Sequence, residues 1–237
     1  MIVIFNDALG DNDTFIAFSL IYFTGVGLLI LRWVFREFSS ILKLKKEKKQ
    51  VELLHLKSQV NPHFFFNTLN NLYGIVEQDT VKAQQLILKL SDMMRYSIYE
   101  GQHDYVDLGE EIEYLQNYID LHQMRYHKKV DVNFEIDVED RSVKIMPLLF
   151  IILLENAFKH GVENLRNDAF VAISLKSNHQ TLVFDIRNNF DPEEVGDKVG
   201  IGLKNLRRRL ELAYPDRHDL SVQNSNGIFK AKLDLQL

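Results

Sequence analysis

One apolar segment dominates the first part of the chain. Residues 15–31 read FIAFSLIYFTGVGLLIL without a charge, and residues 33–35 extend this segment past Arg32. About 20 helical residues cross a hydrocarbon core of about 30 Å. The pattern therefore predicts a transmembrane helix over residues 14–35, preceded by a short extracytoplasmic segment over residues 1–13.

The charges around this segment favour a membrane span over its two alternatives, a buried core helix and a cleaved signal peptide. A signal peptide begins with basic residues, whereas the charged residues before this segment are all aspartates. The basic residues follow it: Arg32, Arg36, Lys43, Lys45, Lys46, Lys48 and Lys49. By the positive-inside rule, we expect the C-terminal part to be cytoplasmic. The residues expected outside are too few for a sensory domain.

Two stretches after the span have the pattern of amphipathic helices. Residues 36–60 and 81–98 carry apolar side chains at spacings of three and four. Pro62 interrupts or kinks the first, because proline lacks a backbone N–H and restricts the residue before it. Two such helices cannot bury both apolar stripes alone, so we expect a second copy to complete a four-helix bundle.

The remainder of the chain alternates between helical and strand-like patterns. We expect helices over residues 107–126, from Pro147 to a stop at Gly161, and from Leu203 to Tyr214. Alternating apolar residues predict strands at 130–138, 171–175, 182–186 and 229–235, with a hairpin at 224–227. The overall class is α+β, and residues 105–237 are expected to form an α/β sandwich on one mixed sheet.

Composition narrows the functional classes. The 28 basic and 33 acidic residues give a net charge of −5, which argues against direct nucleic-acid binding. The chain has no cysteine, so disulfides, thiolate metal sites and a cysteine nucleophile are excluded. The mean hydropathy of −0.15 averages an apolar span, a basic stretch and two cytoplasmic modules.

The first motif with candidate chemistry is NPHFFFN, residues 61–67. It places His63 beside a helix break and Asn67 one turn later on the same face. An imidazole that is neutral near pH 7 can act as a nucleophile or phosphoryl acceptor. An ordinary capped helix start, with His63 as a surface or core residue, is the alternative.

The second motif is ENAFKHG, residues 155–161, at the end of an apolar helix. Asn156 offers a hard carbonyl oxygen suited to Mg²⁺, Lys159 offers a positive charge to a phosphate, and Glu155 can orient water in the metal shell. The alternative is a plain helix end, where Lys159 and His160 meet the helix dipole.

The third motif is the glycine pair Gly200 and Gly202, which opens a helix just before Leu203. Glycines let backbone N–H groups approach a phosphate at the positive end of a helix. An ordinary turn before a helix would explain the same residues.

These motifs in this order, with strands between them, resemble the LytS/YehU-type sensor histidine kinases, whose ATP-binding domain belongs to the GHKL superfamily. The resemblance runs from about residue 51 to the C-terminus. It is carried by NPHFFFN, LSDMMRYS, YVDLGEEIEYLQNYIDLHQMRY, PLLFIILLENAFKHG and GIGLKNLRRRLELAYP. It implies that residues 36–104 form a juxtamembrane helix and a dimerisation and phosphotransfer domain, and that residues 105–237 bind ATP.

The resemblance also implies roles for single residues. His63 is expected to be the phosphoacceptor, with Asn67 and Glu155 as further catalytic residues and Asn156 as the Mg²⁺ ligand. The expected ATP-binding set is Asn156, Lys159, His160, Asn188, Gly200, Gly202 and Leu203. The chain departs from the family at the Asp-x-Gly-x-Gly box, where it has NNFDP from Asn188. A neutral asparagine makes a weaker hydrogen bond to adenine than an aspartate would.

We therefore expect a homodimeric sensor kinase that spans the bacterial cytoplasmic membrane once, in contact with lipid. It would use ATP and Mg²⁺ and pass a phosphoryl group from His63 to a response regulator, often of the LytTR type, without touching DNA itself. Family members commonly have several membrane helices, so a short variant or an incomplete N-terminus is expected. The alternatives are a catalytically weak pseudokinase or dimeric scaffold, and an ATPase that acts on no histidine.

Overall fold

The chain forms two compact units, Met1–Glu52 and Leu53–Leu237. A computed structural model describes residues 2–57, 62–125, 130–163, 165, 168–191 and 200–237. The NPHFFFN motif begins at residue 61, which lies outside the described residues together with residues 58–60. The interruption or kink expected before Pro62 therefore falls on residues that the structure does not describe.

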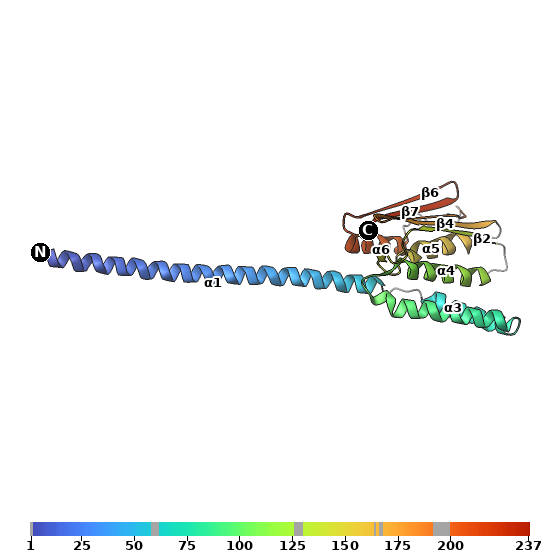
Figure 1. The fold of residues 1–237 in the computed structure, drawn as a ribbon, viewed down its shortest axis with the longest axis horizontal. Coiled ribbons are helices and arrows are strands. Elements are labelled where there is room, and N and C mark those ends of the chain that lie inside the picture. The colour runs from blue at the N-terminus through green and yellow to red at the C-terminus, as the bar shows by residue number, and fades with distance from the viewer. Residues whose placement is uncertain (1, 58–61, 126–129, 164, 166–167, 192–199) are drawn as a thin grey trace. The chain divides into compact units, whose positions relative to one another are not determined.

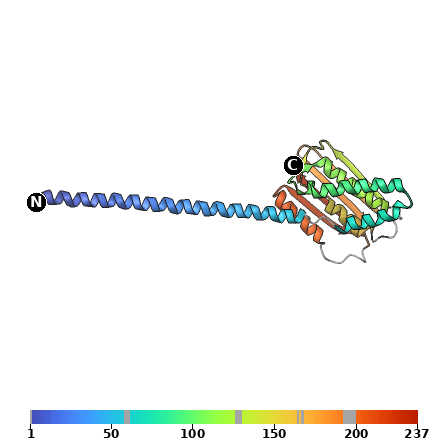
Figure 2. The ribbon, with the colours of Figure 1, turned by 90° about the horizontal axis from the view of Figure 1, so that it is seen from below.

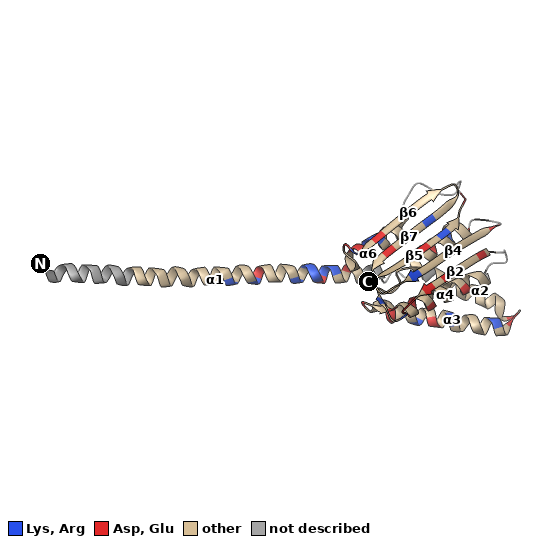
Figure 3. Ribbon diagram, turned by 45° about the horizontal axis from the view of Figure 1, so that its top comes forward, with Lys and Arg blue, Asp and Glu red and all other residues tan. Residues whose placement is uncertain are grey.

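Helix α1 runs without interruption from Ile2 to Lys57, 56 residues in all. Within it, Ile16–Leu53 contains a window of mean hydropathy 1.8, none of it buried, which is long and apolar enough to cross a membrane. The Lys and Arg residues of α1, blue in the ribbon, follow its apolar part (Figure 3). Length and composition thus agree with the predicted span, and the helix expected over residues 36–60 is confirmed as far as Lys57.

The second unit has three layers: a sheet, a layer of helices and a helical hairpin (Figures 1 and 2). The hairpin consists of α2, Pro62–Val76, and α3, Thr80–Ile98. The middle layer contains α4, Leu108–Arg125, α5, Ile151–Ala157, and α6, Ile201–Ala213. The sheet forms the outer layer, so the middle helices bury one of its faces.

The five-stranded sheet has the order β2-β4-β5-β7-β6. Its strands are β2, Val130–Val138, β4, Ala169–Ser177, β5, Thr181–Asn189, β6, His218–Ser225, and β7, Ile228–Gln236. Only the β2–β4 pair is parallel among these, so the predicted mixed sheet is confirmed. The apolar side chains of β2 are half-buried, because this strand lies at the sheet edge.

Alternation along the strands sends one set of side chains into the core. Ile173 on β4, Phe184 and Ile186 on β5 and Leu233 on β7 are at most 3% exposed. Phe150 stacks on Phe184 with ring centroids 4.8 Å apart and so joins the helix layer to the sheet. The hairpin between β6 and β7 turns at Asn226 and Gly227, both with positive φ, as expected for a two-residue turn of this kind.

Two short strands lie outside the main sheet. β1, Val106–Asp107, pairs antiparallel with β3, Lys144–Ile145. An ion pair joins Lys144 Nζ to Asp107 at 2.9 Å across this ladder. The ladder fixes the start of α4 close to the segment that leads into α5.

The helix expected to start at Pro147 is wrong at both ends. α5 starts only at Ile151, because Leu148 has a φ of 56° and cannot be part of an α-helix. The predicted stop at Gly161 is also wrong, since a π-helical segment, Phe158–Val162, continues through it. Short π-helical segments of this kind occur frequently at functional sites.

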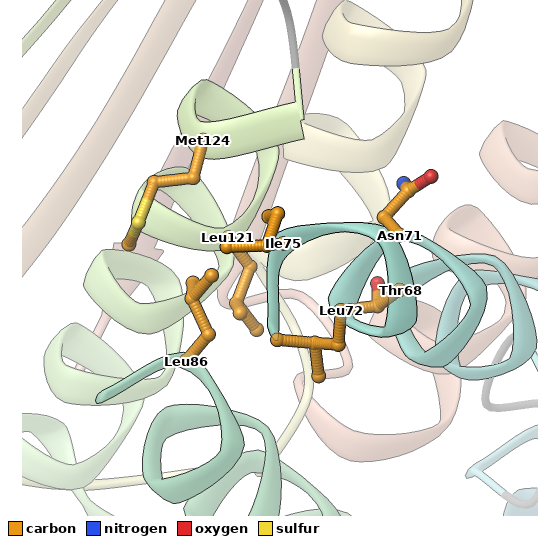
Figure 4. Close-up of a pocket in the computed structure, with 7 residues that line it drawn as sticks. All are labelled: Thr68, Asn71, Leu72, Ile75, Leu86, Leu121 and Met124. Atoms are coloured by element: carbon orange, nitrogen blue, oxygen red, sulfur yellow. The ribbon is translucent and has the colours of Figure 1, made fainter. Parts of the chain in front are cut away.

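The hairpin layer packs on α4 through one face of each helix. In α3 the buried residues are Ala83, Leu86, Leu90 and Met93, at the spacings of three and four that predicted an amphipathic helix. A small recess remains between α2, α3 and α4 (Figure 4). It is lined by Thr68, Asn71, Leu72, Ile75, Leu86, Leu121 and Met124. Its lining is mainly apolar and contains none of the predicted site residues.

Candidate functional site

The fold brings the second and third motifs together at one end of the middle layer. Asn156 lies in the last turn of α5, and Gly202 lies in the first turn of α6. A Cβ on Gly202 would lie 3.9 Å from Asn156 Oδ1 and 3.6 Å from Ile152 Cγ2. The proposed metal ligand and the proposed phosphate-binding turn are therefore neighbours, although they are far apart in sequence.

Gly161 brings the Asn motif against the end of β5. A Cβ at this position would overlap the amide nitrogen of Asn188 and come within 2.6 Å of the carbonyl oxygen of Asn189. Only glycine permits this close approach between the π-helical segment and the strand. The residue predicted to end a helix instead sets the distance between ENAFKHG and Asn188.

Asn188 carries a buried side-chain acceptor that has no partner among the described residues. Its side chain is 1% exposed, and its Nδ2 donates to the carbonyl oxygen of Asn189 at 3.0 Å. Its Oδ1 has no hydrogen-bond partner within the described part of the chain. An unsatisfied buried acceptor costs about 1–3 kcal/mol, which a donor on a bound molecule would offset.

The other predicted nucleotide contacts have contrasting environments. Lys159 and His160 are exposed on the π-helical segment, whereas Leu203 is 8% exposed and belongs to the core. Gly200 caps α6 with a φ of −59°, so its backbone does not require glycine, and a Cβ there would meet open space. Lys159 and the backbone at Gly200 are accessible to an anion, but Leu203 serves mainly packing.

Glu155 is a carboxyl group whose pKa lies close to neutral pH. Burial raises its pKa from 4.5 to about 7, and the positive charge of Lys159 one turn later opposes that rise. A carboxyl group with a pKa near 7 can both accept and release a proton under physiological conditions. Burial and the charge of Lys159 together lower the pKa of the nearby His160, so this imidazole is more often neutral.

From Pro62 on, the NPHFFFN motif lies on α2, with His63, the predicted phosphoacceptor, as the second helical residue. The side chain of His63 lies outside the described residues, and Asn67 is half-buried further along the same helix. Phe64, which follows His63, has a buried side chain. It stacks on Tyr118 and His122 of α4, with ring centroids 4.8 Å and 5.1 Å away.

This aromatic cluster connects the start of α2 to the Asn motif. The ring of His122 lies 4.6 Å from that of Phe158, which begins the π-helical segment directly after α5. Phe64 and Phe158 therefore both contact the ring of His122. The backbone that carries His63 is thereby held on the side of α4 that also contacts the end of ENAFKHG.

A buried network beside the site was missed by sequence reasoning. Glu111 on α4 is fully buried and Arg209 on α6 is 3% exposed. Burial raises the pKa of Glu111, an effect opposed by its hydrogen-bond donors and by the charge of Arg209. Burial lowers the pKa of Arg209 to about 10. A signal existed in the sequence, because Glu111 lies on the apolar stripe of α4 with Leu108 and Leu115.

The donor set for a metal at this site is limited to few protein atoms. Among the residues that the structure describes, no group of three or more His, Cys, Asp or Glu side chains could hold a metal ion. Asn156, half-buried beside Gly202, is the hard oxygen donor of the site. Such a site fits Mg²⁺, which usually keeps several waters and takes few protein ligands beside substrate phosphates.

Comparison with known proteins agrees with these features. A family model described as histidine kinase matches residues 51–130. The sensor protein LytS of Staphylococcus haemolyticus is 32% identical over 207 residues, which cover 79% of this chain and 35% of LytS. The sensor histidine kinase BtsS of Escherichia coli K12 is 31% identical over 178 residues, or 74% of this chain and 31% of BtsS.

The chain thus spans about a third of the length of these curated relatives. Among solved structures, histidine kinase ThkA in complex with the response regulator TrrA matches at 16% identity over 82% of this chain and 66% of that chain. Its TM-score of 0.43 is too low to establish the fold by itself. The sequence matches carry the assignment, and by them the chain belongs to the LytS-type sensor histidine kinases.

Proposed function

We propose that this chain is the kinase part of a membrane-bound, two-component sensor that transfers the γ-phosphoryl group of ATP to His63. The observation that carries the proposal is the convergence of three sequence segments at one place. Asn156 lies against Gly202, and Gly161 lies against Asn188. These are the same segments that the family resemblance assigns to the nucleotide.

The nucleotide would be held from two sides. The Oδ1 of Asn188 would accept from the adenine amino group, which supplies the donor that this buried oxygen lacks. The backbone between Gly200 and Gly202, at the positive end of α6, would face the phosphates. Lys159 would add a positive charge near them. His160 and Leu203 would complete the wall of the site without bonding to the reacting groups.

Asn156 is the residue that would hold Mg²⁺ through its carbonyl oxygen. When bound, Mg²⁺ neutralises the charge that develops on the transferring phosphoryl group. Phosphoryl transfer otherwise depends on positioning, to which the stacking of Phe64 on α4 would contribute. Glu155, with its pKa near 7, would take the proton from His63, and Asn67 one turn along α2 would orient the imidazole.

The remaining features support a dimer in a membrane. The hairpin exposes apolar side chains that a second copy would cover, including Leu69, Tyr73, Val76, Ile87, Leu88, Met94 and Ile98. A four-helix bundle formed by residues 36–104 of two copies would bury them. α1 would cross the bacterial cytoplasmic membrane once, in contact with lipid, with the ATP-binding part, residues 105–237, in the cytoplasm. The phosphoryl group would pass to a response regulator, for which a LytTR-type protein is our candidate.

The test uses the full chain in detergent micelles with γ-labelled ATP and Mg²⁺. We expect an acid-labile label that is lost in His63→Gln and retained in the matched variant His103→Gln, a histidine that the site does not use. Nucleotide binding without any label would favour a dimeric signalling scaffold over a kinase. Separately, Asn156→Ala should abolish Mg²⁺-dependent nucleotide binding, and an unchanged affinity would contradict the metal assignment.

A further inference from the structure

The segment between β3 and α5 is held by side chains from two different helices. Arg209 of α6 donates to the carbonyl oxygens of Pro147 and Leu148 at 2.7 Å and 2.8 Å. The hydroxyl of Tyr214, just after α6, accepts from the N–H of Met146 at 2.8 Å. This four-residue segment, 146–149, is called the α5 entry loop below. It is the segment in which Leu148 takes its left-handed conformation.

Glu111 of α4 holds the same loop from the other side. Its Oε1 accepts from the N–H of Leu148, and its Oε2 accepts from the N–H of Leu149 at 3.3 Å. Glu111 and Arg209 therefore bind adjacent backbone groups of one loop. Both side chains are buried, so a displacement of either must move the loop or leave its backbone groups without partners.

A third helix reaches this loop through a single hydroxyl group. Tyr96 of α3 donates to Oε1 of Glu111 at 2.6 Å, the same oxygen that accepts from Leu148. α3 belongs to the hairpin that carries the proposed phosphoacceptor, whereas α5 and α6 carry the proposed nucleotide contacts. The hydrogen bond of Tyr96 is thus a direct polar link between the two halves of the proposed reaction.

We propose that Tyr96 is a positioning residue that couples the position of α3 to the nucleotide site, through Glu111, the α5 entry loop and Arg209. This inference rests on the nucleotide binding that the proposed function requires. Binding coupling is reciprocal, so a nucleotide that binds α5 and α6 must also stabilise α3 through this link. The role proposed for Tyr96 is to position Glu111 and the α5 entry loop, not to react with ATP or His63.

The experiment compares two variants that each remove one polar link between α3 and α4. Tyr96→Phe removes the hydroxyl and leaves the ring. The matched control is Lys89→Met. It removes the ion pair between Lys89 Nζ of α3 and Asp120 Oδ2 of α4, which are 2.5 Å apart, and leaves Glu111 untouched. The full chain in micelles is studied by hydrogen exchange with and without Mg²⁺ and a non-hydrolysable ATP analogue, and autophosphorylation is measured in parallel.

We expect the analogue to slow exchange in α3 of the unaltered chain and of Lys89→Met, and to lose this effect in Tyr96→Phe. The kcat of autophosphorylation should fall about tenfold in Tyr96→Phe, the loss of one hydrogen bond to a charged group, and less than twofold in Lys89→Met. The two effects of Tyr96→Phe and Glu111→Gln should not add in the double variant, because both act on one link.

Equal protection of α3 in Tyr96→Phe and Lys89→Met would overturn the coupling, as would full additivity in the double variant. These outcomes leave the kinase proposal intact if the unaltered chain still labels His63. A chain that binds no nucleotide would overturn the proposed function and this inference with it. A chain that binds nucleotide but carries no label would overturn only the kinase function, since the exchange data still decide the role of Tyr96.

Discussion

Glu111 and Glu155 are two carboxyl groups in neighbouring parts of one unit, and burial raises the pKa of both. The two carboxyl groups differ in the number of hydrogen-bond donors around them. Glu111 accepts from Tyr96, Leu148 and Leu149 and lies in the field of Arg209. For Glu155, the opposing influence is the exposed Lys159. The comparison teaches that several hydrogen-bond donors hold a buried carboxyl group in one fixed position, whereas a carboxyl group with few donors stays free to exchange its proton near pH 7.

Removing the structural carboxylate should produce the largest effect on stability. We expect Glu111→Ala to lower the free energy of unfolding by about 3–5 kcal/mol, because it leaves Arg209 as a buried charge without its counter-charge. Chemical unfolding of the full chain in micelles measures this. Glu111→Gln keeps the shape of the side chain and one acceptor oxygen, so it should lose less. Equal stability of Glu111→Ala and the unaltered chain would contradict a structural role for Glu111.

Removing the titrating carboxylate should affect the rate and leave the fold intact. Glu155→Gln should lower the autophosphorylation rate by about 10²- to 10⁴-fold, the usual contribution of a positioned general base. The thermal midpoint should stay level or rise, because the amide no longer carries a charge out of water. The control is Glu163→Gln, a nearby exposed carboxylate. A rate that stays within twofold in Glu155→Gln would remove this residue from the mechanism.

The pH profile tests the same residue without mutation. A base with a pKa near 7 is mostly protonated at pH 6, so the rate should be about fivefold lower there than at pH 7 and should level off above pH 8. The charged group that acts on Glu155 is Lys159, in the π-helical segment that follows α5. Burial and the charge of Glu155 raise the pKa of Tyr114 on α4, so this phenol stays neutral over the same pH range. A flat profile from pH 6 to 8 would exclude Glu155 as the proton acceptor.

The stability contribution of Glu155 should have the opposite pH dependence. Its folded-state pKa lies above 4.5, so the folded state binds the proton more tightly than the unfolded state. The stabilisation is complete below pH 4.5 and is lost as pH rises through about 7. Comparison of unfolding curves of the unaltered chain and Glu155→Gln at pH 5 and pH 8 isolates this contribution.

The smallest expected effect comes from Lys159. Its positive charge lowers the pKa of Glu155, so Lys159→Gln should move the midpoint of the rate profile to higher pH. The shift should be less than about one pH unit, because Lys159 is exposed and water screens its charge. Rates are compared at saturating nucleotide, so that weaker phosphate binding does not distort the profile. A midpoint that moves to lower pH would contradict the assigned interaction.

Most elements of the second unit follow from local patterns, and the failures have a common cause. The strands at Val130–Val138 and Thr181–Asn189 and the turn at Asn226 and Gly227 were predictable, because alternation and turn chemistry act over a few residues. The start of α5 was not. Leu148 adopts its conformation within a loop bonded by Glu111 and Arg209, which lie 37 and 61 residues away in sequence.

The candidate site shows the same division. Asn156 and Gly202 were recognised from their motifs, and the structure places them side by side. The role of Gly161 could not be foreseen, since it depends on the approach of Asn188 from another strand. The link from Tyr96 to Glu111 was equally hidden, although a glutamate on the apolar stripe of α4 was a sign that it is buried with donors.

The continuity of α1 has a consequence for how a signal could travel. An α-helix turns by about 100° per residue, so the number of residues between two positions fixes the angle between their side chains around the helix axis. From Ile16 to Lys57 the helix is unbroken, so this angle is fixed along its whole length. Insertion of a single residue between positions 36 and 57 would therefore rotate Lys57 by about 100° relative to the span, whereas insertion of seven residues would nearly restore its azimuth. If kinase activity rises and falls with the number of inserted residues, the signal travels along α1 as a rotation of the helix about its axis.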